Sequence, residues 1–298
     1  MGADILLFGG NGQVGWELQR ALAPLGHVVA LDVEDCDLTN ADDITGTIRV
    51  LAPRIIVNAA AYTAVDRAED DAASAGCINA AAPGVIAEEA RRLGAPLIHY
   101  STDYVFDGRK DGAYVETDSP APLSVYGRTK RDGELAIEAS GAKAVIFRTS
   151  WVFGVHGGNF VKTILRLARE RETLRVVADQ VGSPTPTALL ADVTAQVLVR
   201  LRREGFADGC QLFHVAAASP LSWHGFATAI VEQARVRGLP GLKLSPEAIE
   251  PIATAAYPLP AMRPANSRLD CSHLEQTFGL TMPEWNPYLQ RMLSLPGI

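Results

Sequence analysis

Residues 5–15, Ile-Leu-Leu-Phe-Gly-Gly-Asn-Gly-Gln-Val-Gly, form a short apolar run followed by a glycine-rich segment. A helical pattern of apolar residues comes directly after them. In a strand, turn and helix of this kind, Gly9 permits the tight turn and Gly12 lets the backbone approach a pyrophosphate, while Gly15 lets the helix pack closely on the strand. The segment therefore predicts a βα unit with a phosphate-binding loop.

A second apolar run, residues 27–31, ends at Asp32, about 20 residues beyond Gly12. A carboxylate at this point of such a fold accepts a hydrogen bond from a ribose hydroxyl and repels a 2′-phosphate. The pattern predicts a dinucleotide site with a tilt toward NADH over NADPH. A glycine-rich turn that binds nothing is the alternative, and the second strand followed by an acid disfavours it.

Apolar strands and helical patterns continue to alternate along the first half of the chain, which indicates a doubly wound parallel sheet of Rossmann type. The predicted strands cover 54–58, 96–100 and 143–148, and the predicted helices lie around 80–93 and around Tyr126. Ligands of such sheets bind beyond the carboxyl ends of the strands. Polar segments occur at these places: residues 58–63, 101–104 and 149–151.

The second half of the chain predicts helices at 160–172, 188–203 and 223–237, with proline-rich loops between them. We predict a dinucleotide-binding domain over 1–150 and a smaller α/β substrate domain over 151–298, with residues 188–218 returning to the first sheet. Arg263 and Arg268 lie in a loop whose prolines exclude a long helix. Such arginines can clamp a diphosphate, and the alternative is that they are solvated or paired with acids.

Residues 126–130, Tyr-Gly-Arg-Thr-Lys, place a phenol and an ammonium four positions apart. On a helix both side chains project from one face. A phenol with a pKa near 10 is a poor acid or base at neutral pH, and a nearby positive charge brings that pKa closer to neutrality. The pair predicts a tuned proton donor, Tyr126 assisted by Lys130. An exposed lysine beside a half-buried tyrosine is the alternative.

The composition narrows the class of protein. A formal net charge of −7 over 298 residues argues against nucleic acid as a partner. The four cysteines are scattered without paired spacing, which predicts reduced thiols. The opening residues 1–4 contain no basic segment and no stretch approaches 18 apolar residues, so we predict a cytoplasmic protein that does not bind a membrane.

Taken together, these motifs resemble those of the dTDP-4-dehydrorhamnose reductases, a family of extended short-chain dehydrogenase/reductases. The resemblance covers nearly the whole chain. It rests on the segments Gly12-Gln13-Val14-Gly15, residues 58–66 (Asn-Ala-Ala-Ala-Tyr-Thr-Ala-Val-Asp), residues 101–106 (Ser-Thr-Asp-Tyr-Val-Phe), residues 126–130, residues 147–151 (Phe-Arg-Thr-Ser-Trp) and residues 263–267 (Arg-Pro-Ala-Asn-Ser).

The resemblance implies reduction of the 4-keto group of dTDP-4-dehydro-6-deoxy-L-mannose by NADPH or NADH, the last step of dTDP-L-rhamnose synthesis. Hydride addition turns the carbonyl oxygen into an alkoxide, which needs a proton and a hydrogen-bond donor. By analogy, Tyr126 would donate the proton, Lys130 would lower the pKa of Tyr126 and hold the nicotinamide ribose, and Thr102 would hydrogen-bond the same oxygen.

The same resemblance implies two sets of binding residues. The cofactor residues would be Gly9, Gly12, Gln13, Val14, Asp32, Asp37, Leu38, Ala61, Tyr62, Thr63, Tyr126 and Lys130. The substrate residues would be Thr102, Asp103, Trp151 and Arg263. No metal-binding motif is present, and the acids Asp66, Glu69, Asp70 and Asp71 are typical of the first turn of a helix, so no catalytic metal is expected.

Related activities remain alternatives. A sugar-nucleotide 4,6-dehydratase usually has Glu after Thr-Asp to shuttle a proton, whereas this chain has Tyr104. An epimerase or another 4-ketoreductase would look similar, and a noncatalytic regulatory subunit could keep the dinucleotide fold. The intact set of Thr102, Tyr126 and Lys130 favours an enzyme. A homodimer is a further possibility that the sequence leaves open.

Overall fold

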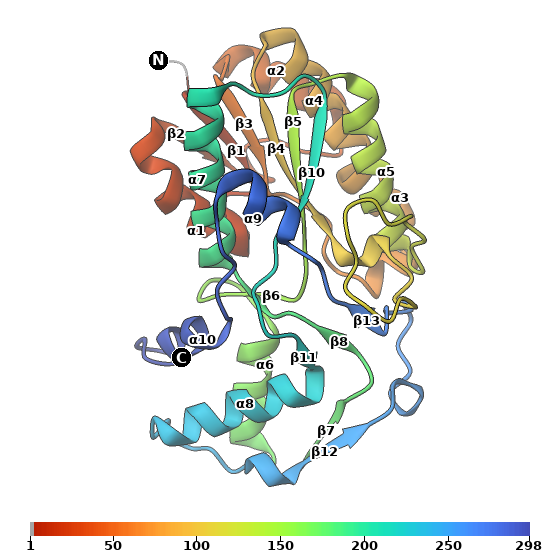
Figure 1. Ribbon diagram of the computed structural model, residues 1–298, viewed down its shortest axis with the longest axis vertical. Coiled ribbons are helices and arrows are strands. Elements are labelled where there is room, and N and C mark those ends of the chain that lie inside the picture. Colours follow the sequence, from red (N-terminus) through yellow and green to blue (C-terminus); the bar gives the residue numbers. More distant parts are fainter. Residues whose placement is uncertain (1–2) are drawn as a thin grey trace.

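The computed structural model describes residues 3–298, so residues 1 and 2 of the opening segment 1–4 lie outside it. The larger, upper part of the molecule holds a parallel sheet with the strand order β2-β1-β3-β4-β5-β10 (Figure 1). Its strands are β1 Ile5–Phe8, β2 Val28–Leu31, β3 Ile55–Asn58, β4 Leu97–Thr102, β5 Ala144–Thr149 and β10 Cys210–His214. The order reverses beside β1, which confirms the predicted doubly wound sheet.

Helices cover both faces of this sheet. The helices are α1 Gln13–Leu22, α2 Ala41–Leu51, α3 Ala72–Gly76, α4 Ala82–Leu93, α5 Val125–Ser140 and α7 Thr187–Glu204. Successive residues of a strand point to opposite faces. Ile5 and Leu7 therefore pack in the core on the side of α1 and α7, whereas Leu6 and Phe8 pack with α2, α4 and α5. A π-helical turn, Cys77–Ala81, joins α3 to α4.

The smaller, lower part contains short strands and further helices (Figure 1). They are β6 Val152–Phe153, α6 Phe160–Glu170, β7 Leu174–Val177, β8 Val181–Gly182, β9 Thr185–Pro186, β11 Leu221–Ser222, α8 Trp223–Val236, β12 Ile249–Ile252, β13 Asn266–Ser267 and α10 Asn286–Met292. Helix α9, Ser272–Phe278, lies against β10 in the upper part. Strand β7 pairs with β12, β6 with β9, and β8 lies between β11 and β13. Short 3-10 turns cover Ala23–Leu25, Arg67–Glu69, Asp103–Val105, Pro246–Ala248 and Thr254–Ala256.

The chain crosses between the two parts more than once. After β9 it enters α7, which packs against α1, and then β10, which pairs in parallel with β5 along the edge of the large sheet. Residues 187–214 thus lie with the first half of the chain. The bounds 188–218 given above for this return stay a prediction. A clean division into domains at residue 150 stays a prediction.

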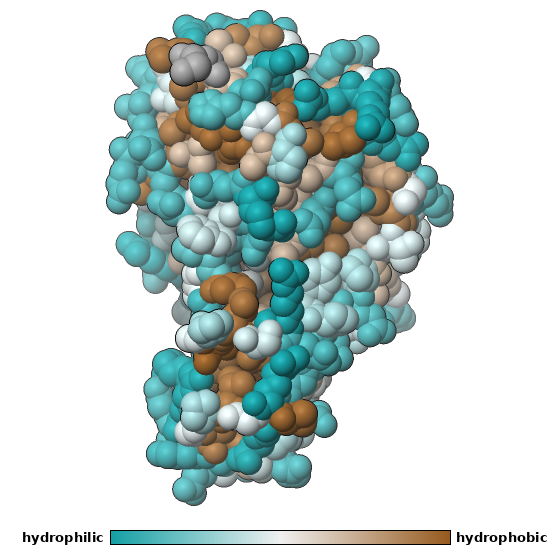
Figure 2. All heavy atoms as spheres, turned by 90° about the vertical axis from the view of Figure 1, so that its left-hand side faces the viewer, coloured by the Kyte–Doolittle hydropathy of each residue, from teal (hydrophilic) through white to brown (hydrophobic). Residues whose placement is uncertain are grey.

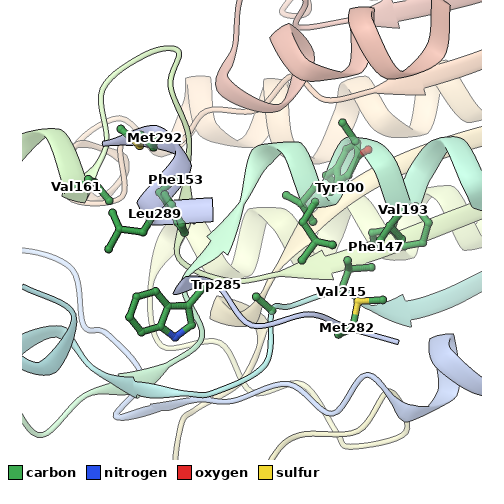
Figure 3. Packing of buried hydrophobic residues seen from close by; sticks show 14 of the residues in the cluster. Tyr100, Phe147, Phe153, Val161, Val193, Val215, Met282, Trp285, Leu289 and Met292 are labelled. Atoms are coloured by element: carbon green, nitrogen blue, oxygen red, sulfur yellow. The ribbon is translucent and has the colours of Figure 1, made fainter. Parts of the chain in front are cut away.

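One apolar cluster runs through both parts. In Figure 3, Tyr100 of β4 and Phe147 of β5 belong to the same cluster as Trp285, Leu289 and Met292 near the C-terminus. Figure 2 shows hydrophobic residues gathered in a strip on the narrow lower part, at the height of α6, α8 and α10, whereas they are scattered among hydrophilic residues above. Across residues 3–298, no helix is long and apolar enough to cross a membrane.

Candidate active site

A cavity of about 620 Å³ lies at the carboxyl ends of the central strands. This is the edge of a doubly wound sheet at which ligands bind. Most of the cofactor residues expected from the sequence line this one cavity: Gly9, Gly12, Gln13, Val14, Asp32, Asp37, Leu38, Ala61, Thr63, Tyr126 and Lys130. Segments far apart in the chain are therefore brought together around a space suited to an extended ligand.

The glycine-rich loop is packed so tightly that side chains are excluded at two positions. Gly9 has a φ of +79°, and a Cβ there would lie 2.7 Å from the backbone nitrogen of Ala60. A Cβ at Gly15 would lie 1.9 Å from the carbonyl oxygen of Gly9. Gly12 stands at the start of α1, where no side chain caps the helix. The free N–H groups of this helix end face the cavity, where a phosphate can accept from them.

We expect Gly15→Ala to weaken dinucleotide binding, because the added methyl group must push α1 away from the loop. The strain should lower the free energy of unfolding by about 1–3 kcal/mol and raise the Kd for NADPH and NADH roughly tenfold or more. Fluorescence titration and urea unfolding would measure both. Gly46→Ala on α2 is the matched control, since a Cβ there meets nothing within 4 Å. It should leave the Kd unchanged and stabilise the helix. Unaltered Kd values for Gly15→Ala would contradict the assigned packing.

Two carboxylates shape the end of the cavity beyond β2. One oxygen of Asp32 accepts from the backbone N–H of Asn11 at 2.9 Å, and the other accepts from the N–H of Val33 at 2.8 Å. Asp37 accepts from the backbone N–H and hydroxyl of Thr39, both at 2.8 Å, and these bonds hold its pKa below the usual range. Both acids line the cavity.

Tyr62 is placed differently from the other residues expected to bind cofactor. Its hydroxyl donates to Asp71 at 3.1 Å, so the phenol is directed toward the start of α3. Its backbone N–H donates to the side-chain oxygen of Asn79 at 2.9 Å, and the Asn79 amide donates to Thr129 on α5 at 3.2 Å. Asn79 thus ties the loop after β3 to the helix that carries Tyr126. Asn79 could not be predicted from the sequence, because nothing in the local pattern marks a buried amide in a π-helical turn.

Helix α5 begins at Val125, where the hydroxyl of Ser124 accepts from the Gly127 N–H at 3.1 Å. Tyr126 and Lys130 follow one turn apart, and both line the cavity. The Lys130 ammonium donates to the carbonyl of Tyr100 at 2.6 Å. Burial lowers the pKa of Lys130 to about 8, against the opposing charge of Glu134.

Burial also raises the pKa of Tyr126 to about 12, and a hydrogen bond with the Thr102 hydroxyl opposes that shift. The Tyr-x-x-x-Lys motif predicts that the charge of Lys130 lowers this pKa, but in the structure desolvation is the largest effect on the phenol and raises it. Tyr126 is therefore protonated at neutral pH. A protonated phenol is the form that can give a proton to a developing alkoxide.

The end of β4 places Thr102 and Asp103 beside this phenol. The Thr102 hydroxyl donates to Asp103 Oδ1 at 3.1 Å and accepts from the Tyr104 N–H at 3.2 Å. Asp103 is buried, and its Oδ2 has no hydrogen-bond partner within residues 3–298. Burial raises the pKa of Asp103 to about 6. An acceptor oxygen is thus left available next to the reactive phenol.

A second, larger cavity of about 980 Å³ lies in the lower part of the molecule. Its wall is partly apolar, with Phe160, Trp223 and Tyr257, and includes Arg263. Tyr126 contacts the edge of Tyr104, with ring centroids 5.4 Å apart, and the charge of Arg263 in turn acts on the Tyr104 hydroxyl. Tyr126 thus lines the smaller cavity and is linked through the ring of Tyr104 to Arg263, on the wall of the larger one.

The loop arginines are held by polar partners. Both terminal nitrogens of Arg263 donate to the carboxylate of Asp66, at 3.0 and 2.7 Å. Arg268 donates to the side-chain oxygen of Asn266 at 2.8 Å and to the backbone of Asp111. Arg263 still faces the larger cavity, while Arg268 ties the loop to residues around 111.

The acidic segment expected to form one helical turn is divided among different contacts. Asp66 pairs with Arg263, Glu69 accepts from the N–H of Val125 at 2.8 Å, and Asp71 caps α3 by accepting from Ser74. Within the described range 3–298, no group of three or more His, Cys, Asp or Glu side chains could hold a metal ion. That a metal takes no part in catalysis stays a prediction.

Trp151 has a φ of +47°, and its indole stacks on Trp223 with centroids 3.5 Å apart. A side chain at Gly182 would collide with the same ring. The indole is partly buried and shares its stack with a residue of the larger cavity wall. This agrees with a place beside a bound sugar, and also with the alternative role of a packing aromatic.

Several lining residues were not expected from the sequence: Asn11, Val33, Thr39, Val152, Gly157 and Gly158. Only the consecutive glycines Gly157 and Gly158 give a sequence signal, because such a pair indicates a loop that can approach a ligand closely. They belong to a loop that covers the glycine-rich segment, where His156 contacts the carbonyl of Asn11 at 2.9 Å and Asn159 donates to Gln13 at 3.1 Å.

Comparison with known proteins decides the family. A family model described as RmlD substrate binding domain matches residues 3–295. The chain is 48% identical over 296 residues to the dTDP-4-dehydrorhamnose reductase of Escherichia coli K12, covering 98% of this chain and 97% of that protein. The chain belongs to the dTDP-4-dehydrorhamnose reductase family. The corresponding protein of Burkholderia thailandensis is 48% identical over 286 residues, with 94% and 95% of the two chains covered.

Solved structures of dTDP-4-dehydrorhamnose reductases share the fold. The Bacillus anthracis reductase, whose crystal structure is a complex with NADP, is 34% identical and superposes with a TM-score of 0.87, covering 98% of this chain and 99% of that one. The glycine-rich segment 9–15 and the Tyr-x-x-x-Lys segment 126–130, described above, are thus found in a member of this family. The roles of its individual residues stay predictions.

Proposed function

We propose that this protein reduces the 4-keto group of dTDP-4-dehydro-6-deoxy-L-mannose to give dTDP-L-rhamnose, with NADPH or NADH as the hydride donor. One observation carries the proposal: a protonated Tyr126 lines a dinucleotide-sized cavity, in a chain 48% identical to reductases of this kind. The residues fit a dinucleotide, because the uncapped start of α1 lies at the cavity behind a loop in which Gly9, Gly10 and Gly12 carry no side chain.

The reaction needs a proton as well as a hydride. A reduced nicotinamide supplies the hydride that forms the new C–H bond at C4 of the sugar. The carbonyl π electrons then reside on oxygen, and the Tyr126 hydroxyl gives its proton to that oxygen. The Thr102 hydroxyl would turn its hydrogen from Asp103 to the same oxygen and donate to it as negative charge develops. The charged Lys130 stabilises the phenolate that remains on Tyr126.

The substrate would extend from this point into the larger cavity. The unpartnered Oδ2 of Asp103 can accept a hydrogen bond from a sugar hydroxyl. Trp151, stacked on Trp223, would place an apolar surface beside the sugar ring. Arg263, oriented by Asp66, would hold the diphosphate with its guanidinium group. These assignments give each end of the sugar nucleotide a partner of matching chemistry.

Arg263→Met tests the diphosphate contact. Loss of a charge-assisted hydrogen bond is worth about 1.5–3 kcal/mol, so the KM for the sugar nucleotide should rise about 10- to 100-fold while kcat changes little. Steady-state kinetics at fixed cofactor would measure this. Arg203→Met, an exposed residue at the far end of α7, is the control and should leave KM unchanged. A normal KM for Arg263→Met would remove this arginine from the binding site.

The activity itself can be tested with purified protein. The 4-keto-L-sugar nucleotide is made in situ from dTDP-4-dehydro-6-deoxyglucose with a 3,5-epimerase, and loss of reduced-nicotinamide absorbance is followed with NADPH and with NADH. Oxidation that requires the epimerase and yields dTDP-L-rhamnose supports the proposal. Oxidation without the epimerase would indicate a reductase for the D-configured ketosugar. No oxidation by folded protein would reject the proposal and favour a noncatalytic role.

Three rival functions are disfavoured. Tyr104 occupies the position at which a dehydratase would need a carboxylate, and its ring packs against Tyr126. The nearly full-length similarity to reductases argues against an epimerase or a regulatory subunit. A cytoplasmic location, a homodimer, a lack of nucleic-acid or membrane binding, and the choice between NADPH and NADH stay predictions.

A further inference from the structure

His99 lies in the middle of β4, completely buried, between Asn58 on β3 and Lys130 on α5. Its Nδ1 is 3.2 Å from the amide nitrogen of Asn58, and its Nε2 is 3.4 Å from Nζ of Lys130. None of the steps above uses this histidine. A titratable group in contact with the lysine of the active site nevertheless affects how that lysine holds its proton.

The hydrogen bonds around Asn58 decide which nitrogen of His99 carries the proton. The backbone N–H of Ala60 donates to Asn58 Oδ1 at 3.1 Å, and a backbone N–H can only donate. The side-chain nitrogen of Asn58 must therefore be the atom that faces His99. Since an amide nitrogen also only donates, Nδ1 of His99 must accept. A neutral His99 then carries its proton on Nε2.

That proton is directed at Lys130. Burial and the charge of Lys130 hold the pKa of His99 well below its ordinary value, so the ring is neutral. An N–H on Nε2 opposes an ammonium group but can donate to an uncharged amine. The 3.4 Å contact is long beside the 2.6 Å hydrogen bond from Lys130 to Tyr100, as expected for two facing donors.

We propose that Asn58 fixes His99 in the Nε2–H tautomer, and that this tautomer weakens the hold of Lys130 on its proton. His99 is thus a positioning residue that acts through Lys130. The catalytic consequence of this inference rests on the proposed function. A lysine that releases its proton near neutral pH can help to reprotonate Tyr126 after each turnover. Other groups also act on Lys130. The Tyr100 carbonyl on β4 and Glu134 on α5 favour its charged form.

Glu134 is itself paired with Arg148 on β5 and Arg131 on α5, and Tyr126 lies one turn before Lys130. Asp103, beyond β4, acts on Tyr126. These groups are the same in the variants below, so a change in the Lys130 titration can be assigned to His99 and Asn58.

The test is a titration of Lys130 by NMR with ¹³C-labelled lysine, assigned with Lys130→Arg. In His99→Gln the amide oxygen can accept from the ammonium. In Asn58→Leu His99 is free to place its proton on Nδ1 and accept through Nε2. Both variants should raise the midpoint of the Lys130 titration by about one pH unit. This corresponds to a roughly tenfold higher affinity of the Lys130 amine for its proton than in the unaltered protein. His27→Gln, at an exposed position, is the control and should leave the midpoint unchanged.

A long-range ¹H–¹⁵N spectrum of the histidines provides a second measurement, with His99 assigned by its loss in His99→Gln. The Nε2–H tautomer supports the proposal, and an Nδ1–H tautomer in the unaltered protein overturns it. An unchanged Lys130 midpoint in the folded variants also overturns it. Both measurements are independent of turnover, so absent reductase activity would reject the proposed function while His99 is still tested. In an active enzyme, the high-pH limb of kcat should move upward with the Lys130 midpoint.

Discussion

Tyr126→Phe should lower kcat for ketosugar reduction by about 10²- to 10⁴-fold, the usual contribution of a positioned general acid. The substitution removes one oxygen and keeps the ring, so packing against Tyr104 is retained. The Kd for NADPH should change little, because the phenol gives its proton only as the alkoxide forms. Single-turnover kinetics of reduced-nicotinamide loss, with Kd from fluorescence titration, would separate the two effects.

Tyr104→Phe is the matched control for this experiment. Its hydroxyl is buried beside the same ring, and burial raises its pKa even further than that of Tyr126. The proposed reaction takes no proton from it, so kcat should stay within a few fold of the unaltered enzyme. An equal loss in both variants would show that the effect comes from disturbed packing. A fully active Tyr126→Phe would remove Tyr126 as the proton donor.

Arg148→Met should produce the largest loss of stability. Arg148 and Glu134 are both almost fully buried and form two hydrogen bonds, at 2.8 and 2.6 Å. Removing the arginine leaves a buried carboxylate without its main partner, which costs about 3–5 kcal/mol of the free energy of unfolding. Urea unfolding at pH 8 would measure the loss. Arg131→Met, which removes a partly exposed partner of the same carboxylate, should cost about 1 kcal/mol or less.

The pH dependence of this loss has a definite sign. In the unaltered protein, Arg148 and the other donors hold the pKa of Glu134 below its ordinary value. Their contribution is present above an ordinary carboxyl pKa of about 4.3 and is lost as the pH falls through the folded value. In Arg148→Met, burial raises the pKa of Glu134 instead, so the penalty is largest at high pH.

The difference in stability between the two proteins should therefore be smaller at pH 5 than at pH 8, because the Glu134 carboxyl of the variant is then protonated. The double variant Arg148→Met/Glu134→Gln should recover much of the loss at pH 8, since no buried charge remains. A loss that is independent of pH and persists in the double variant would point to a packing defect around Phe106, over whose ring Arg148 lies at 5.0 Å.

Much of the architecture is encoded in short segments. The strand, glycine turn and helix of residues 5–22 form because the apolar pattern and the glycines act locally, and these residues appear as β1 and α1. The four-residue spacing of Tyr126 and Lys130 likewise places both on one face of α5. Helices predicted at 160–172, 188–203 and 223–237 match α6, α7 and α8 to within a few residues.

The chemistry of the site depends on contacts between distant segments. Asp66 and Arg263 are 197 positions apart, so their pairing could not be predicted from either neighbourhood. The partnership of Asn79 with Tyr62, and of His99 with Lys130, joins residues that no periodicity connects. Local sequence patterns indicate which face of a helix or strand is apolar. They do not indicate which polar group of another helix or strand a given side chain contacts.

The protonation states of Tyr126 and Lys130 show most clearly what the sequence predicts and what only the tertiary structure determines. The motif at 126–130 predicts a phenol and an ammonium near each other, and that prediction needs nothing beyond helical geometry. How strongly each group holds its proton depends on how much water and which charges surround it. The fold buries both side chains, which raises the pKa of Tyr126 and lowers that of Lys130. Desolvation is a property of the assembled molecule, because several distant segments together exclude the water.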